Sequence, residues 1–148
     1  MNFTFIALLI VIAFPTSSFA MGELRFNSAL PLLQESEIDS FLRKEFETKS
    51  TDYIIAQTDL NNDLAKEYVL KRNYCKTKNE QSCNHIIIGK TKDKFVVLGN
   101  IRAKKLVISS TKTHNITDIL AFDNDLNDYD FDIYVWSPKE KMYILEAN

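Results

Sequence analysis

The chain has 148 residues, a formal net charge of −2 and a hydrophobic fraction of 45%, which is enough apolar material for one folded domain with a substantial core. A net charge so close to zero gives no general attraction to nucleic acid, and two cysteines are too few for a dense disulfide framework. Beyond the N-terminus, no apolar stretch reaches the about 18 residues that a membrane-spanning helix needs.

The first twenty residues predict an export signal. They contain no charged side chain, and residues 5–14 form an unbroken apolar run of ten, which is shorter than the about 20 residues that cross a bilayer. Small residues at Ser18 and Ala20 fit the pattern that signal peptidase accepts. We therefore expect residues 1–20 to be cleaved and residues 21–148 to form one domain, in the periplasm or secreted, with no stable membrane anchor. The alternative is a buried N-terminal helix, since no Lys or Arg precedes the apolar run.

Charge is divided into three blocks along the chain. Residues 21–70 carry ten acidic and five basic side chains, residues 71–112 carry two acidic and eleven basic, and residues 113–148 carry eight acidic and two basic. Opposite charges that pair across neighbouring strands would explain the pattern. Alternatively, the basic block forms a surface for an acidic partner. Nucleic acid is a poor candidate for that partner in an exported protein with acidic flanks.

Residues 31–47 predict a helix. Apolar side chains recur near helical spacing and would face the core at Leu33, Ile38, Phe41, Leu42 and Phe46. Ser36 and Asp39 resemble a capping box near the start of this helix.

Short β-rich runs follow from residue 53 onward, separated by polar breaks. The breaks are too short for crossover helices, which favours antiparallel pairing. The runs are residues 53–57, 67–72, 85–89, 95–99, 106–109, 116–122, 131–136 and 142–145. With only three glycines in the chain, the turns must rely on Asn, Asp and Lys. The predicted fold class is α+β, with one N-terminal helix packed on a meandering, mostly antiparallel β-sheet.

Cys75 and Cys83 predict a structural disulfide, because two cysteines this close usually pair in an oxidising compartment. The bridge would close a nine-residue loop, which stabilises by roughly 2.5 kcal/mol in the loop-entropy model. A redox motif would place its cysteines closer together. A zinc site would need more ligands than His85 and His114 can add.

Residues 58–70 read TDLNNDLAKEYVL and space four oxygen-bearing side chains as a calcium loop does: Asp59, Asn61, Asp63 and Glu67. However, Leu64 lacks the conformational freedom of the glycine that lets such a loop turn sharply. Leu70 stands where a bidentate Glu would complete a calcium hand. We therefore expect a weak calcium site at most, and no other metal or cofactor. The alternative is a β-turn capped by Asp59 and Asn61.

The same stretch resembles the D-L-N-G-D-G-x-x-[DE]-hydrophobic motif of FG-GAP and VCBS-type repeats. It matches at Asp59, Leu60, Asn61, Asp63, Glu67, Tyr68 and Val69, and it departs at Asn62 and Leu64, where the motif has glycine. A helix, one such motif, two nearby cysteines and a strand at residues 117–122 together resemble a group of small secreted bacterial proteins of unknown function. The resemblance implies export but no activity, and a propeller would need repeated blades.

A second acidic stretch, residues 122–132, reads FDNDLNDYDFD. It predicts a solvated turn that leads into a strand. The alternatives are ion binding and an acidic recognition patch formed by Asp123, Asp125, Asp128 and Asp130.

Catalytic signatures are missing from the sequence. It contains no Gly-x-Ser-x-Gly elbow and no phosphate loop, so we expect no enzyme and no catalytic residues. The sequence favours a non-catalytic secreted or periplasmic binding protein, of the inhibitor or immunity type, whose partner is another protein. The alternative is a small carboxylate-dependent hydrolase acting on cell-wall or polysaccharide material, because acidic sequences readily supply a pair of carboxylates.

Overall fold

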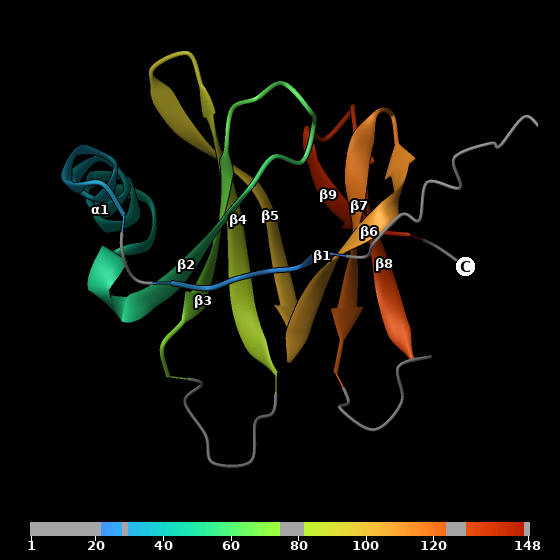
Figure 1. Cartoon of the computed structure of the whole chain (residues 1–148). Helices are drawn as coiled ribbons and strands as arrows, with labels where there is room; N and C mark the ends of the chain where they lie inside the picture. The colour runs from blue at the N-terminus through green and yellow to red at the C-terminus, as the bar shows by residue number, and fades with distance from the viewer. Residues whose placement is uncertain (1–21, 28–29, 75–81, 124–129, 147–148) are drawn as a thin grey trace, which may run out of the picture.

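The computed structural model describes residues 22–27, 30–74, 82–123 and 130–146. All strand pairs are antiparallel, as the sequence predicts, but the strands form two sheets (Figure 1). The four-stranded sheet follows the chain order β2 (Tyr53–Thr58), β3 (Glu67–Arg72), β4 (Cys83–Thr91) and β5 (Lys94–Ala103). The five-stranded sheet has the order β1 (Gly22–Glu23), β6 (Lys105–Thr113), β7 (Ile116–Phe122), β8 (Phe131–Ser137) and β9 (Met142–Leu145).

The chain changes sheets at a single residue, Lys104. Strand β5 ends at Ala103 and β6 begins at Lys105, and the Lys104 N–H donates to the Phe122 carbonyl at 2.9 Å. Strand β6 therefore pairs with β7 and not with β5. The N-terminal segment also spans both sheets, because β1 pairs with β6 and Asn27 forms a β-bridge with Ile55 of β2.

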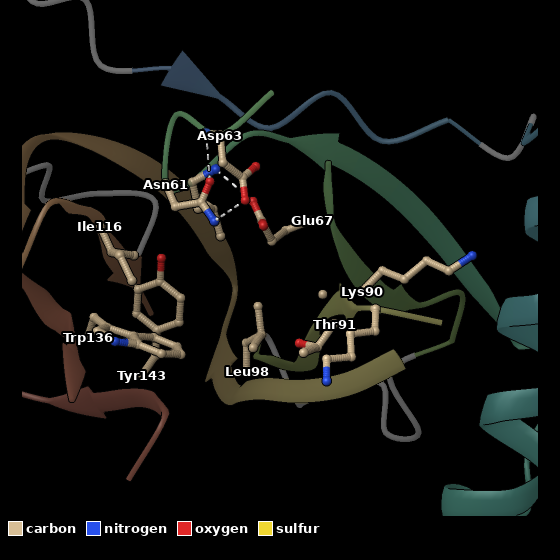
Figure 2. A pocket seen from close by; sticks show the side chains of 12 residues that line it. Asn61, Asp63, Glu67, Lys90, Thr91, Leu98, Ile116, Trp136 and Tyr143 are labelled. Atoms are coloured by element: carbon tan, nitrogen blue, oxygen red, sulfur yellow. Dashed lines mark hydrogen bonds between the residues drawn. The ribbon is translucent and has the colours of Figure 1, made fainter. Parts of the chain in front are cut away.

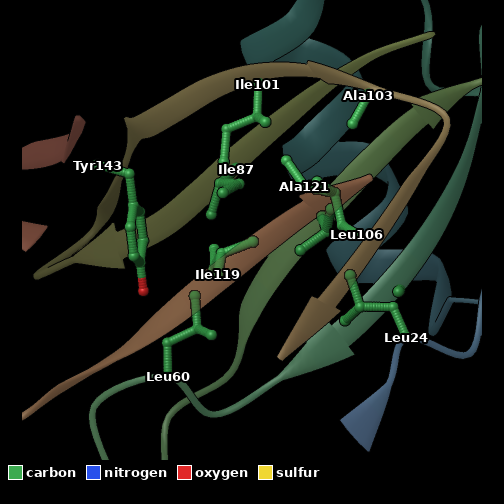
Figure 3. Close-up of a cluster of buried hydrophobic side chains, with 11 residues drawn as sticks. Leu24, Leu60, Ile87, Ile101, Ala103, Leu106, Ile119, Ala121 and Tyr143 are labelled. Carbon is green, nitrogen blue, oxygen red and sulfur yellow. The ribbon is translucent and has the colours of Figure 1, made fainter. Parts of the chain in front are cut away.

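The four-stranded sheet is buried on both faces, with the five-stranded sheet on one side and helix α1 (Leu32–Phe46) on the other (Figure 1). Between the sheets lies a cluster of apolar side chains (Figure 3): Leu24, Ala56, Leu60, Val69, Ile87, Ile101, Ala103, Leu106, Ile119, Ala121 and Tyr143. On the helix side, Ile38 and Leu42 of α1 join Tyr53, Ile55, Tyr68, Leu70, Ile86 and Ile88. Alternate residues of β3 and β4 thus pack in two different cores. Burial of each Ile or Leu stabilises the fold by about 1.5–3 kcal/mol.

Helix α1 departs from the sequence prediction at its start. It begins at Leu32 with Pro31 as N-cap and no side-chain cap, so the capping box expected at Ser36 is wrong. Asp39 instead accepts the Ser50 N–H at 2.8 Å, which ties α1 to the short 3-10 helix η1 (Ser50–Asp52). This hydrogen bond, followed by that from Arg43, lowers the pKa of Asp39. Leu33 is 82% exposed, contrary to expectation, because it lies about 140° around the helix from Ile38.

The tight turns use residues other than glycine. Positive φ angles occur at Glu47, Asn62, Leu64, Lys92, His114, Asn115 and Lys141, and at no described glycine. The β6–β7 hairpin turns through His114 and Asn115, both left-handed, which is the combination that a type I′ turn requires. Within the described residues, no helix has both the length and the apolar character to cross a bilayer.

Candidate functional site

The loop between β2 and β3 is held by its own side chains. Asp59 accepts the N–H of Asn62 at 2.8 Å and that of Leu64 at 3.1 Å. The side chain of Asn61 accepts the Asp63 N–H at 2.9 Å and donates to the Asp63 carboxylate at 2.9 Å, and Asp63 accepts the Ala65 N–H at 2.8 Å. These oxygens bind backbone amides within the turn, which is the capping arrangement that the sequence offered as the alternative to ion binding.

Two residues of this loop adopt the backbone conformation that favours glycine. Asn62 has φ of 61° and Leu64 has φ of 70°, and these are the two positions where the FG-GAP-type motif has glycine. Asn tolerates the left-handed region because of its short polar side chain, but Leu does not. Leu64 is also 89% exposed, so packing gives it little compensation.

The side chains proposed for calcium make hydrogen bonds within the protein. Across the described ranges, no three His, Cys, Asp or Glu side chains are placed to hold a metal ion. Glu67, the first residue of β3, points its carboxylate at the backbone: Oε2 accepts the Leu60 N–H at 2.7 Å. A weak calcium site at Asp59, Asn61, Asp63 and Glu67 stays a prediction.

Glu67 is a buried acid, with 6% of its surface exposed. Burial raises its pKa above the usual value, and the negative charges of Asp63 and Asp59 raise it further, although the Leu60 N–H acts in the opposite direction. The Leu60 carbonyl accepts the Thr117 N–H of β7 at 2.8 Å. Leu60 is therefore bonded to both sheets, to Glu67 through its amide and to Thr117 through its carbonyl.

Beside Glu67, the ends of the two sheets line an open cavity of about 420 Å³ (Figure 2). The loop and Glu67 form one wall, and Trp136 of β8 and Tyr143 of β9 form another. The complete lining is Leu60, Asn61, Asp63, Glu67, Gly89, Lys90, Thr91, Lys92, Leu98, Ile116, Trp136 and Tyr143. The cavity therefore combines an acidic wall with an aromatic one.

The aromatic wall is fixed in place. Tyr143 donates its hydroxyl to the Thr117 carbonyl at 2.8 Å, and its ring meets that of Trp136 edge-on, with centroids 5.7 Å apart. Burial, followed by the charges of Glu67 and Asp118, raises the pKa of Tyr143, which keeps the hydroxyl a donor. Trp136 and Tyr143 are also direct cross-strand partners in the pairing of β8 with β9.

Two glycines allow close packing around the cavity. A Cβ at Gly89 would lie 2.7 Å from Leu98 Cδ1 and 3.5 Å from Glu67 Cγ, and one at Gly99 would lie 3.2 Å from Tyr143 Cβ. A glycine inside a strand often marks such a close approach. No sequence motif marks the cavity residues of β4, β5, β8 and β9. These two strand glycines and the single tryptophan were the available signals.

The other predicted sites are described only in part. Cys83 is the buried first residue of β4, while Cys75 lies outside the described residues, so the disulfide stays a prediction. Asp123 and Asp130 are exposed, and Asp123 accepts a hydrogen bond from Ser82 Oγ at 2.7 Å. Asp125, Asp128 and the predicted signal peptide also lie outside the described residues.

The cavity lining contains no histidine. His85 is fully buried in β4, and its Nδ1 lies 3.0 Å from the Cys83 carbonyl oxygen. Burial, together with the charge of Lys71, lowers the pKa of His85 to about 4. His85 is therefore neutral at physiological pH and lies away from the cavity.

Comparison of the chain with protein-family models, curated proteins and solved structures gives no match.

Proposed function

We propose that this chain is a non-catalytic binding protein, exported to the periplasm or secreted, that holds another protein at the cavity between its two sheets. The observation that carries the proposal is the cavity itself: about 420 Å³, with a buried acid on one wall and two aromatic rings on another. Binding sites are typically concave and largely apolar, with a few convergent polar groups. The predicted signal peptide supports the location.

The scaffold supports tight recognition. The proposal takes the α+β arrangement, with α1 packed on the four-stranded sheet, as the rigid body that carries the site. Most lining residues lie on strands, which hold side chains more precisely than loops do. The loop that completes the cavity is fastened to β3 by Glu67 and to β7 by Thr117.

The size of the cavity favours an anchor over an extended substrate. About 420 Å³ lies at the small end of ligand sites and accommodates one side chain or one small group. Protein interfaces commonly concentrate their affinity in a few anchors of this kind. A cavity of this volume is suited to an inhibitor or immunity-type protein that binds one side chain of its target.

Affinity capture with a matched pair of variants tests the proposal. Thr91 is exposed and lines the cavity, so Thr91→Trp should block the mouth without disturbing the core. Thr51 in η1 is also exposed but does not line the cavity, so Thr51→Trp is the control. The wild type and Thr51→Trp should retain the same partner from an extracytoplasmic extract, and Thr91→Trp should lose it. If Thr91→Trp retains the partner as well as the wild type does, the binding site lies elsewhere.

One observation favours a second candidate, the carboxylate-dependent hydrolase. A buried carboxyl group with a raised pKa, beside aromatic rings in a cavity, is the environment of a general acid. Glycoside hydrolysis needs a second carboxylate, and Asp63 is the other acid in the lining. Turnover of cell-wall or polysaccharide substrates that disappears in Glu67→Gln, but persists in the exposed control Glu140→Gln, would establish this function instead.

A further inference from the structure

We propose that the cavity receives a positively charged side chain, a lysine or an arginine, from the partner protein. This inference rests on the proposed function and adds the chemistry of the group that enters. It is carried by three features of the cavity: an acidic wall without a paired cation, an aromatic wall, and lysines that are directed elsewhere or exposed.

The acidic wall lacks a counter-charge. Across the described residues, no Lys or Arg lies within ion-pair distance of the Glu67 carboxylate. The neighbouring charges of Asp63 and Asp59 are also negative and disfavour ionisation of Glu67. A buried carboxylate is costly unless it is paired. A cation that enters the cavity would supply the missing partner and make a charge-assisted hydrogen bond.

The aromatic wall suits the same ligand. The rings of Trp136 and Tyr143 line the same cavity as the acid (Figure 2). The face of an aromatic ring carries the negative part of its quadrupole and therefore attracts cations. Leu98 and Ile116 add apolar surface to the lining. A lysine or arginine combines an apolar stem with a charged head, so the stem can pack against these residues while the head reaches Glu67.

The protein's own lysines leave the position open. Lys90 contributes to the lining, but its Nζ lies 2.7 Å from Glu37 of α1 and 5.7 Å from the centre of the Phe95 ring. Figure 2 shows this side chain running away from Glu67. Lys92 is exposed at the β4–β5 turn. Neither forms an ion pair with the acidic wall.

Intrinsic fluorescence gives a direct test, because Trp136 is the only tryptophan in the chain. The probes are N-acetyl-lysine and N-acetyl-arginine, both as N-methylamides. Their neutral counterparts are the corresponding derivatives of norleucine, which keeps the aliphatic stem of lysine, and of citrulline, which keeps the shape of arginine; both lack the charge. We expect saturable changes in Trp136 fluorescence with the cationic probes, and affinities at least about tenfold weaker for the neutral ones, as expected for loss of one charge-assisted contact.

Variants of the acidic wall test whether its negative charges bind the cationic probes. Glu67→Gln should weaken binding of the cationic probes by about tenfold or more, and Glu140→Gln should leave it unchanged. Asp63→Asn alters an exposed carboxylate of the same wall and serves if Glu67→Gln folds poorly; it should weaken binding by about two- to threefold, as for a partly screened charge.

The outcomes separate the two proposals. Neutral probes that bind as tightly as the cationic ones, or Asp63→Asn and Glu67→Gln proteins that bind like the wild type, would overturn the charge inference. The cavity would remain the binding site if Thr91→Trp still abolished capture of the partner. Absence of binding by any probe would likewise overturn the charge inference, whereas unchanged capture by Thr91→Trp would overturn the proposed function as well.

Discussion

Leu64→Gly should stabilise the protein, although it removes a side chain. A left-handed backbone costs a residue with a Cβ about 1–2 kcal/mol, and Leu64 has φ of 70°. Its side chain is 89% exposed, so little packing is lost. Glycine gains more freedom in the unfolded chain, which offsets roughly 0.5–1 kcal/mol of the benefit. The net expectation is a gain of about 0.5–1 kcal/mol, or roughly 2–5 °C in Tm for a domain of this size.

Thermal and urea unfolding of three variants measures this gain. Leu64→Ala removes the leucine side chain but keeps the Cβ, so it should not show the gain. Ala65→Gly adds a glycine to the same loop at an exposed residue without a positive φ, so it should lose about 0.5–1 kcal/mol. If Leu64→Gly destabilises as much as Ala65→Gly does, Leu64 is not strained in solution and the reasoning is refuted.

Four further predictions concern the cavity, the cysteines and calcium. Because the pKa of Glu67 is raised in the folded state, its contribution to stability is present below the unfolded pKa and is lost as pH rises through the folded pKa. Urea unfolding at several pH values should therefore show the wild type losing stability relative to Glu67→Gln between these two pKa values. Tyr143→Phe leaves the Thr117 carbonyl without its 2.8 Å donor and should cost about 1–3 kcal/mol, measured by urea unfolding. Cys83→Ser should lower the free energy of unfolding by roughly 2.5 kcal/mol if Cys75 is its partner, and thiol titration of the native protein should find no free cysteine. Calcium at ~1 mM should stabilise by only about 0.4 kcal/mol against a chelator, for a Kd near ~1 mM, and a Tm shift of many degrees would show a structural ion.

The local elements could be predicted from the sequence, but the division into sheets could not. Strands β3, β7 and β9 have the predicted bounds, β2, β4, β5, β6 and β8 extend beyond the runs used to find them, and β1 was not predicted. However, β5 and β6 are joined by one residue, Lys104, and consecutive strands with short connections usually neighbour each other in one sheet. Which of two neighbouring strands pairs with β6 depends on tertiary packing, and no local pattern contains that choice.

The candidate site was predicted in part for a related reason. The acidic half, from Asp59 to Glu67, is contiguous in sequence and showed itself as a motif. The aromatic half is contributed by Trp136 and Tyr143, far along the chain and on two different strands. Both lie in short runs rich in aromatic and aliphatic residues, which is ordinary strand composition. Only the docking of the two sheets brings them to the loop that follows β2.

The double attachment of Leu60 has a consequence for hydrogen exchange. Its own amide is held by Glu67 of β3, and its carbonyl holds the amide of Thr117 in β7. Both amides can exchange with solvent only after these bonds open, and the Thr117 bond joins the loop to the opposite sheet. Exchange at Thr117 therefore measures how often the sheets separate at this end, whereas exchange at the exposed loop residue Ala65 measures fraying of the turn alone. A partner that binds only when the two sheets are in contact should slow exchange at Thr117, and the slowing should increase with its affinity. The exchange rate of this one amide would then report partner binding.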